Sequence, residues 1–439
     1  MCVTSCWEKD LVGLMLFLTL TSMFILNDLH PFTQTVTTTN VTFSLTGTLQ
    51  ASSFKIGAMV GTYNYAGYTA SELASSFNSG LSWWIPSSDT ADQYDQLMST
   101  VHSINPNFKF LIYRNCMSIY NYWPSELAIT NESGWLLKDA HGNYVTEASS
   151  PDNYMVDITN PSYQQWLANT LETWLTQHPQ LNGVFLDNGL KYNAADFVGC
   201  ASSTPINPST RAPYTDQQIQ NGYINLLNTI INTIGTNKIL MPNGVWNGNV
   251  WADESGYQYI LSSVPRLNAL TSEGAFMGYN SNWYSVSSWK DSVNFISWAQ
   301  QNLLAPNSPA LFSPECISSV PPAGATEQQV MEFGLASTLL AVNNPQNVMS
   351  FGLDYAHDSV ALGFVQKVQN LNLVAAVGSY YQVGLTQVFE RDFTAGHVLV
   401  NPSSTAYTIQ LGGSYTTFEG VAVSGQITVN PHTAIILLS

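Results

Sequence analysis

Charged side chains are scarce in this chain of 439 residues, since Asp, Glu, Lys and Arg make up 9% of it, against about 25% in an ordinary soluble protein. Basic residues are the scarcest: 12 Lys and Arg stand against 29 Asp and Glu, which leaves a net charge of −17. Such a surface repels phosphate backbones, and no basic segment is available to release counterions from DNA or RNA. The sequence therefore predicts no nucleic-acid partner.

Several chemical signatures are also missing. No HExxH segment, close histidine pair or CxxC pair suggests a metal site, and no GxGxxG or P-loop suggests a bound nucleotide. A GxSxG segment is absent too, so a serine hydrolase would need an unrecognised nucleophile. We therefore expect no metal and no cofactor, with His141, His357 and His397 at the surface or in local hydrogen bonds.

Cysteine is rare as well. Of five cysteines, two precede residue 11, and Cys116, Cys200 and Cys316 are too few and too widely spaced to define a disulfide framework. At most one bridge can form among these three.

One long apolar run stands near the N-terminus, at residues 11–26. It is longer than the core of a signal peptide, about 7–15 residues, and shorter than a membrane-spanning helix, about 20 residues. A cleaved signal peptide and a retained membrane anchor both fit, and a buried helix fits less well because Thr-rich sequence follows. Either main alternative places the rest of the chain outside the cell or at its surface. Sequons at Asn40 and Asn131 agree with export.

The rest of the chain alternates between strand and helix patterns. Eight apolar or β-branched runs are separated by amphipathic segments, which is the pattern of a (β/α)8 TIM barrel of the α/β class. A doubly wound sheet is the alternative, but the first strand lacks its glycine motif. The eight runs cover residues 54–63, 81–86, 108–115, 183–188, 238–244, 269–274, 309–315 and 348–354.

Capping residues mark where the helices begin. Thr69 and Thr215 each stand three residues before Glu or Gln, the spacing of a capping box, and Thr326 repeats it. Asn160 precedes a proline at the first helical position, and Gly235 ends the helix that follows Thr215.

From about residue 382 the pattern changes to short alternating strands separated by Gly, Pro, Asn and Ser, which predicts a small antiparallel β-sandwich. The segment 116–160 is long for a loop between barrel strands, and such loops are usually functional. The expected domains are a signal peptide or anchor (1–26), a Thr-rich linker (27–53), the barrel (54–381) and the β-sandwich (382–439).

Carboxylates stand at the ends of four expected strands, although the chain has only 29 acidic residues. They are Asp187, Glu273, Glu315 and Asp354. Barrel active sites form at the carboxyl ends of the strands, and glycosidic bond cleavage needs two carboxylates that face each other. Structural roles are the alternative: a helix cap for Asp187, a hydrogen bond for Glu273, and an ion pair between Asp354 and Arg114.

Other polar and aromatic residues lie near the same ends. Tyr113, Arg114, Asn188 and Asn243 are expected to position sugar hydroxyls, although Arg114 could equally form a structural ion pair. Sugars stack on aromatic rings, and half or more of the rings are expected in the core. The aromatic candidates are Tyr63, Tyr65, Trp83, Trp84, Tyr120, Tyr122, Trp123, Trp135, Trp246 and Trp251, of which the last two are the hardest to bury and are therefore expected to be the best sugar platforms.

Four segments together resemble a known family. They are GVFLDN at 183–188, YMVDITNPSYQQW at 154–166, SEG at 272–274, and VFERDF followed by GHVLVNP near the C-terminus. The set is similar to the hypothetical glycosyl-hydrolase-like TIM-barrel proteins, and more distantly to endo-polygalactosaminidases and α-galactosidase-type barrels, over residues 54–439. The resemblance implies that Asp187 is the nucleophile or stabiliser and that Glu273 is the acid/base. The very low charge departs from the family.

The sequence therefore predicts an exported glycoside hydrolase that cleaves a neutral or amino-sugar polymer or oligosaccharide with Asp187 and Glu273. Tyr63, Trp84, Trp246, Glu315 and Asp354 complete the expected binding residues. The alternative from another class is a non-catalytic carbohydrate-binding or cell-envelope protein on the same barrel, and a structural surface protein is a weaker third.

Overall fold

The computed structural model describes residues 56–58, 68–77, 79–82, 88–245, 248–253, 255–264, 267–278, 282–302, 310–313, 321–341, 349–351 and 359–439. No helix within these ranges is long and apolar enough to cross a membrane. The apolar run at residues 11–26 lies outside them.

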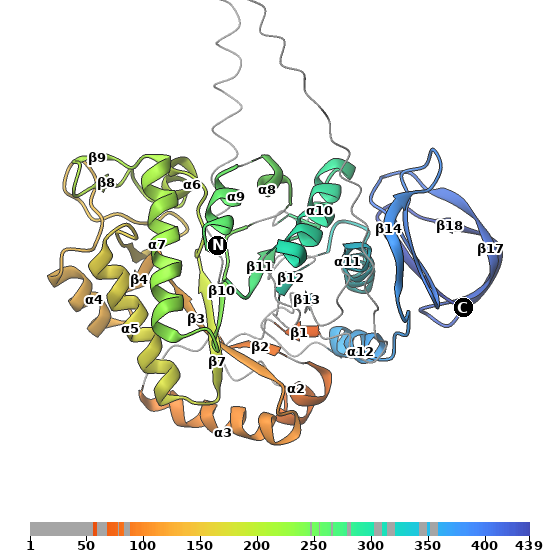
Figure 1. Ribbon diagram of the computed structural model, residues 1–439, viewed down its shortest axis with the longest axis horizontal. Helices are drawn as coiled ribbons and strands as arrows, with labels where there is room; N and C mark the ends of the chain where they lie inside the picture. The colour runs from red at the N-terminus through yellow and green to blue at the C-terminus, as the bar shows by residue number, and fades with distance from the viewer. Residues whose placement is uncertain are drawn as a thin grey trace, which may run out of the picture.

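Eight parallel strands form the centre of the molecule, one within or overlapping each run expected from the sequence (Figure 1). Six of them pair in the order β10-β7-β3-β2-β1-β13, and β11 pairs with β12. Their bounds are β1 (Ile56–Ala58), β2 (Ser79–Ser82), β3 (Lys109–Asn115), β7 (Leu181–Asp187), β10 (Ile239–Pro242), β11 (Leu270–Glu273), β12 (Ala310–Ser313) and β13 (Met349–Phe351).

The two parallel sheets neighbour each other at both ends, since β10 contacts β11 and β12 contacts β13. Between the described residues the hydrogen-bonded ladders nevertheless remain two open sheets. The fold is therefore a mixed α/β arrangement, and closure of the eight strands into a barrel stays a prediction.

The helices begin where the capping residues predict. The Thr69 and Thr215 hydroxyls accept the expected backbone N–H groups in complete capping boxes, Asn160 caps the helix that starts at Pro161, and Thr326 accepts the N–H of Gln329. The helices are α2 (Ala70–Ser76), α3 (Ser88–Ile104), α4 (Pro124–Glu132), α5 (Pro161–Gln177), α6 (Ala194–Gly199), α7 (Asp216–Ile234), α8 (Gly248–Asp253), α9 (Ser255–Ser262), α10 (Val286–Asn302), α11 (Glu327–Ala341) and α12 (Ser359–Val368).

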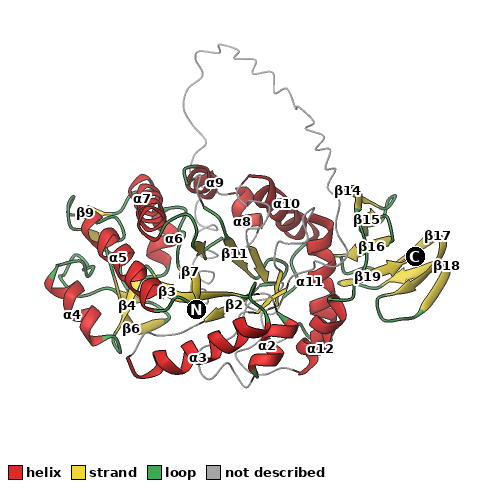
Figure 2. Ribbon diagram, turned by 60° about the horizontal axis from the view of Figure 1, so that its bottom comes forward, coloured by secondary structure: helices red, strands yellow, loops and turns green. Residues whose placement is uncertain are grey.

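These helices pack around the strands largely in chain order. Helix α5 lies against α7, α10 against α11 and α11 against α12, and α12 returns to α2, which packs on α3. Figure 2 shows α2, α3 and α12 on one side of the strands and α8, α9 and α10 on another. The described helices therefore cover the parallel strands from opposite sides.

The long segment after β3 folds into a small subdomain. It contains β4 (Ser118–Tyr120), α4, β5 (Thr146–Glu147) and β6 (Ser150–Met155), and the strands form an antiparallel sheet in the order β4-β6-β5. A second hairpin, β8 (Ile206–Asn207) and β9 (Ala212–Pro213), follows α6 after β7. This subdomain extends the region beyond the carboxyl ends of β3 and β7.

A six-stranded antiparallel sheet forms the C-terminal part, and its first strand begins at Ala376. One face packs on α11: the buried Arg391 donates hydrogen bonds to the carbonyl oxygens of Leu339 (3.0 Å) and Leu340 (3.2 Å) at the end of that helix. The strands are β14 (Ala376–Gln382), β15 (Phe389–Phe393), β16 (Gly396–Asn401), β17 (Tyr407–Thr417), β18 (Ala422–Val429) and β19 (Thr433–Leu438).

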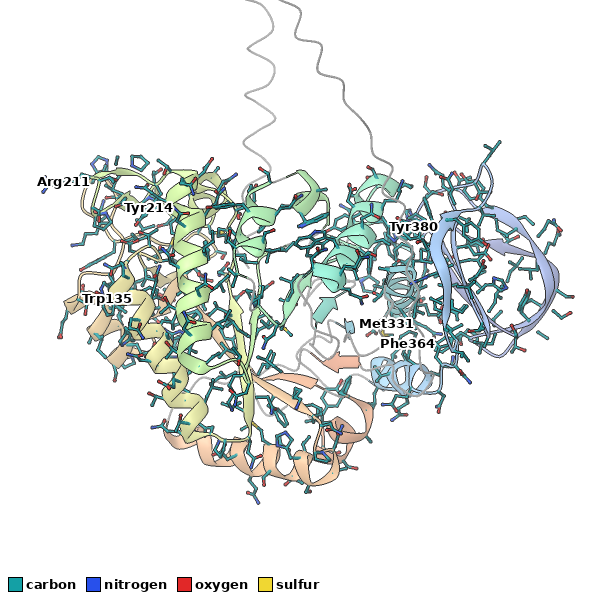
Figure 3. All side chains as sticks on the ribbon, in the orientation of Figure 1. Trp135, Arg211, Tyr214, Met331, Phe364 and Tyr380 are labelled. Atoms are coloured by element: carbon teal, nitrogen blue, oxygen red, sulfur yellow. The ribbon has the colours of Figure 1, made fainter. Side chains whose placement is uncertain are left out.

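Apolar side chains fill the junction between this sheet and the helices. Figure 3 labels Met331 on α11, Phe364 on α12 and Tyr380 on β14 at this junction, and the Tyr380 hydroxyl donates to Asn294 on α10 at 3.0 Å. The opposite face of the sheet has its own cluster of Val388, Leu399, Ile409, Val429 and Leu437. The described strands thus form one curved sheet, and the sandwich and the expected domain boundaries stay predictions.

A glutamate at this junction makes stability depend on pH. Burial, and next its hydrogen bond with Glu419, raises the pKa of Glu332 from 4.5 to about 7. Between pH 4.5 and pH 7 the folded state therefore holds a proton on Glu332 that the unfolded state has lost. The contribution of this proton to the free energy of unfolding is complete below pH 4.5 and disappears as the pH rises to 7.

We expect Glu332→Gln to be more stable than the parent at pH 8, by roughly 1–2 kcal/mol after allowance for partial exposure, and not at pH 4. Urea unfolding at both pH values measures this difference. Glu132→Gln, an exposed change on α4, is the matched control. An equal effect of Glu332→Gln at both pH values would contradict the prediction.

Candidate active site

Asp187 is the last residue of β7 and lies where three parallel strands end side by side. In the ladder it stands opposite Asn115 of β3, and β10 pairs on the other side of β7. Successive side chains of a strand point to opposite faces, and Phe185 belongs to a buried cluster on the inner side of the sheet. Asp187 therefore points to the same inner side, at the carboxyl end of the strands.

Three donors hold the Asp187 carboxylate. The Tyr113 hydroxyl donates to Oδ2 at 2.7 Å, while the Asn243 side chain (3.0 Å) and the backbone N–H of Asn188 (2.8 Å) donate to Oδ1. The donors come from β3, from the residue after β10 and from the residue after β7. The structure thus brings together four of the expected site residues, and the carboxylate is fixed in one orientation.

A pair of tyrosines adjoins this carboxylate. The Tyr113 and Tyr120 hydroxyls lie 2.7 Å apart. Burial, and next the charge of Asp187, raises the pKa of both tyrosines above the ordinary value of 10. Both hydroxyls therefore stay protonated at any physiological pH, so that Tyr113 remains a donor to Asp187.

Aromatic rings continue from this pair to the surface. Tyr120 stacks on Tyr122 with ring centroids 5.0 Å apart and meets Trp123 edge-on at 4.6 Å. The ring of Tyr122 is 55% exposed. An exposed aromatic face is therefore two rings away from the hydroxyl that binds Asp187.

A second buried carboxylate, which sequence reasoning missed, belongs to the small subdomain. Glu147 on β5 accepts hydrogen bonds from Ser118 Oγ (2.7 Å), Asn115 Nδ2 (3.0 Å) and Asn153 Nδ2 (3.1 Å). Its charge also contributes to the raised pKa of Tyr120, after burial and Asp187. The length of segment 116–160 was the signal that this region matters, but Glu147 ends no barrel strand.

The turns after β7 and β10 need unusual backbone conformations. Asn188 has φ of 50°, in the left-handed region that asparagine tolerates. Gly244 has φ of 147°, and a Cβ there would lie 2.2 Å from the Leu190 carbonyl oxygen. Glycine is therefore required next to Asn243, which lets the two chain segments approach and present Asn243 to Asp187.

Arg114 does not reach the site, in contrast to the expectation that it binds substrate. It alternates with Tyr113 along β3 and points outward, where its Nη1 forms an ion pair of 2.6 Å with Glu126 of α4. Its guanidinium carbon lies 4.6 Å from the ring centroid of Trp123 and 5.6 Å from that of Trp174. The structural ion pair is therefore what forms, and its partner is Glu126.

Trp251 is a second correction, because it does not offer a free ring. It is half-buried on α8, and its ring centroid lies 5.2 Å from that of Trp298 and 5.4 Å from that of Phe295 on α10. The tryptophan packs between helices rather than serving as a sugar platform.

The remaining expected residues are only partly placed. Glu273 is the last residue of β11, opposite Ser313 of β12, and its side chain lies outside the described part. Outside the described residues altogether are Tyr63, Trp84, Trp246, Glu315 and Asp354, and Cys316 with them.

Cys116 borders the site and is buried. Its thiol donates to the Asn188 carbonyl oxygen at 3.2 Å. Burial, and next the charge of Asp187, raises the pKa of this thiol far above the ordinary range. Cys200 is buried as well.

We expect Cys116 to react with iodoacetamide at pH 8 at least ~100-fold more slowly in the native protein than after unfolding, because the thiolate is the reactive form. Timed labelling followed by peptide mass spectrometry measures the rate, with urea-unfolded protein as the control. Rapid and complete labelling of native Cys116 would contradict the buried position.

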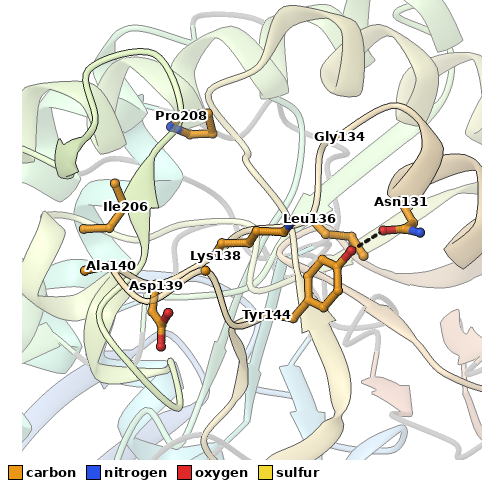
Figure 4. Close-up of a pocket in the computed structure, with 10 residues that line it drawn as sticks. Asn131, Gly134, Leu136, Lys138, Asp139, Ala140, Tyr144, Ile206 and Pro208 are labelled. Atoms are coloured by element: carbon orange, nitrogen blue, oxygen red, sulfur yellow. Dashed lines mark hydrogen bonds between the residues drawn. The ribbon is translucent and has the colours of Figure 1, made fainter.

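A hollow of about 420 Å³ lies between the end of α4, the 138–144 turn and β8 (Figure 4). The Tyr144 hydroxyl donates to Asn131 Oδ1 at 2.6 Å, and the Lys138 ammonium lies 4.8 Å from the centroid of the Tyr144 ring. None of the expected site residues lines this hollow. Its walls are Asn131, Gly134, Leu136, Lys138, Asp139, Ala140, Gly142, Tyr144, Ile206 and Pro208.

Solved structures with a similar fold include an α-amylase and a pullulanase. A noncanonic maltogenic α-amylase, AmyB from Thermotoga neapolitana, superposes with a TM-score of 0.52 at 11% identity, covering 88% of this chain and 98% of that one. A pullulanase from Paenibacillus barengoltzii in complex with maltotriose gives 0.51 at 10% identity, covering 90% of this chain and 79% of that one. At such identities the likeness shows a shared fold.

No curated protein matches the chain. A family model does: that of hypothetical glycosyl hydrolase family 15 matches residues 102–397, from the end of α3 to the start of β16, which includes all the described parallel strands except β1 and β2. This match spans about two thirds of the 439 residues and includes Asp187, its three donors and Glu273. The chain therefore belongs to hypothetical glycosyl hydrolase family 15.

Proposed function

We propose that the protein is an exported glycoside hydrolase that cleaves O-glycosidic bonds of a neutral or amino-sugar polysaccharide or oligosaccharide. Asp187 acts as nucleophile or as the base that activates water, and Glu273 protonates the leaving oxygen. The observation that carries the proposal is the Asp187 carboxylate, which three donors hold at the carboxyl end of β7 in a glycosyl hydrolase family chain.

The position of Asp187 suits this chemistry. A carboxylate that attacks an anomeric carbon, or takes a proton from water beside it, must be held in one orientation. Tyr113 and Asn243 approach from the neighbouring strands and supply that orientation. The raised pKa of Tyr113 keeps its proton in place, so the hydroxyl donates to Asp187 throughout the working pH range.

The strand order supports Glu273 as the partner. Asn243, which binds Asp187, follows β10, and β11 contacts β10 and ends with Glu273. In a closed (β/α)8 barrel, which we propose for the complete set of eight strands, the carboxyl ends meet at one rim. Glu273 then stands two strands from Asp187 on that rim.

The surroundings favour an uncharged ligand. Tyr122 offers an exposed ring beside Tyr120, and aromatic rings stack on the C–H faces of sugars. A net charge of −17 disfavours polyanionic substrates. The α-amylase and the pullulanase of similar fold make α-glucans the first polymers to test.

The test is reducing-end release by the full-length chain on a panel of α-glucans, β-glucans, amino-sugar polymers and polyuronates. We expect cleavage of a neutral or amino-sugar polymer and none of a polyuronate. Binding to glycans without cleavage would instead identify a carbohydrate-binding protein on this fold. Neither binding nor cleavage would reject both functions.

Export is part of the proposal and rests on the apolar run at residues 11–26 and on Asn131, an exposed residue of a sequon on α4. Fractionation of cells that express the full chain with a C-terminal tag tests it. The tag is expected in the medium or accessible at the cell surface, and recovery only inside intact cells would contradict export.

A further inference from the structure

The C-terminal sheet carries a cluster of ionisable side chains on the face that points away from α11. Glu390 and Asp392 lie two residues apart on β15, and Asp392 stands opposite His397 of β16. Arg391, between the two acids, points to the other face and binds α11. Strand alternation and register therefore place three potential metal ligands side by side.

The ligand atoms converge on one point. His397 Nδ1 lies 2.8 Å from Asp392 Oδ1 and 3.0 Å from Glu390 Oε1. All three atoms lie within 4.8 Å of one another, and among the described residues no other set of three or more His, Cys, Asp and Glu meets this condition. The side chains of His397, Asp392 and Glu390 are 28%, 36% and 14% exposed, so that an ion can reach them from solvent.

The second nitrogen of the imidazole is also engaged. His397 Nε2 lies 3.1 Å from the Tyr415 hydroxyl of β17. Metal-binding histidines usually hydrogen-bond through the ring nitrogen that does not bind the metal, which fixes the ring. When Nε2 carries the proton and donates to Tyr415, the Nδ1 lone pair is available to a cation, which would take the place of the Nδ1–Asp392 hydrogen bond of 2.8 Å.

We propose that Glu390, Asp392 and His397 form a binding site for a divalent transition metal ion of the zinc type. One imidazole and two carboxylates are ligands that zinc accepts, whereas calcium and magnesium prefer oxygen alone. Ligand atoms at about 2.0–2.2 Å from a tetrahedral ion lie about 3.3–3.6 Å apart. The nitrogen–oxygen distances of 2.8 and 3.0 Å therefore need to lengthen by about 0.3–0.8 Å, which these partly exposed side chains allow.

Such an ion would stabilise the C-terminal sheet and take no part in the proposed catalysis. It would join β15 to β16 and, through Tyr415, to β17, on the face opposite the one that packs on the helices. The site uses no residue near Asp187, so its presence and the proposed hydrolase activity are independent.

Isothermal titration of the full-length chain with ZnCl2, after chelator treatment, tests the proposal. We expect saturable binding near one ion per chain, at least ~10-fold weaker in His397→Ala and in the nearly isosteric Asp392→Asn. His141→Ala, in an exposed turn, is the matched control and should bind zinc as the parent does.

Circular dichroism separates loss of the site from loss of the fold, and Asp392→Asn preserves side-chain volume in case His397→Ala unfolds the sheet. Absence of saturable zinc binding in the parent would overturn the proposal. Binding that stays unchanged in both folded variants would overturn it as well.

Discussion

Asp187→Asn is expected to lower glycosidic bond cleavage by about 10²-fold to 10⁴-fold or more without unfolding the protein. The amide has the shape of the carboxylate but cannot attack an anomeric carbon or accept a proton from water, and removal of such a group costs rates of this order. The three donors around Asp187 remain in place, and the Tyr113 hydroxyl can turn to accept from the new amide. Reducing-end release on the polymer that the parent cleaves is the measurement.

Two further variants distinguish loss of the Asp187 carboxylate from a general loss of activity. Tyr113→Phe removes one donor from the carboxylate and is expected to cost less, about 10-fold to 100-fold, the scale of a hydrogen bond to a charged group. Asp139→Asn, a partly exposed change in the 139–143 turn that keeps the shape of the side chain, is the matched control and should retain full activity. Undiminished cleavage by a folded Asp187→Asn protein would exclude Asp187 and move the chemistry to other strand-end carboxylates.

The position of Asp187 could be predicted because it depends on local pattern. An apolar run that ends in a carboxylate fixes both the strand and its end, and the capping residues Thr69, Asn160 and Thr215 fix where helices begin. Parallel strands with helices between them follow from the same alternation. These features need only residues that are close in the sequence.

The environment of Arg114 could not be predicted from local sequence pattern. Because successive side chains of a strand point to opposite faces, Arg114 points to the helices whereas Tyr113 and Asn115 point inward. Its partner Glu126 lies on a helix of the long segment after β3, and no sequence pattern fixes how that segment folds back. Arg114 is one of few basic residues and stands at a strand end, which indicated that its side chain is buried but not in which direction it points.

Glu147 and the partners of His397 were missed for a different reason. Glu147 is brought to Asn115 and Ser118 by the β4-β6-β5 sheet, whose strands are only two to six residues long. His397 meets Asp392 only through the register of β15 and β16. Both groupings depend on strand pairing, which sequence spacing alone does not give.

The Arg114–Glu126 pair leads to the second large expected effect. Glu126→Ala should destabilise the fold by about 3–5 kcal/mol, because it leaves the buried guanidinium without its counter-charge. Arg114 is fully buried, with the rings of Trp123, Trp166 and Trp174 around it. The rings stabilise the cation only in part, since a contact of this kind contributes about 2 kcal/mol when desolvated.

A double-mutant cycle separates the pair from its surroundings. Arg114→Met keeps an unbranched side chain between the indole rings and removes the charge, so that Glu126→Ala should cost much less in that background than in the parent. Urea unfolding of the parent, both single variants and the double variant gives the coupling, which we expect at about 2 kcal/mol or more. Glu132→Ala, an exposed change on the same helix, should stay within about 0.5 kcal/mol. Additive costs for the two changes would mean that water reaches Arg114 once Glu126 is gone, and that the ion pair does not hold α4 to β3.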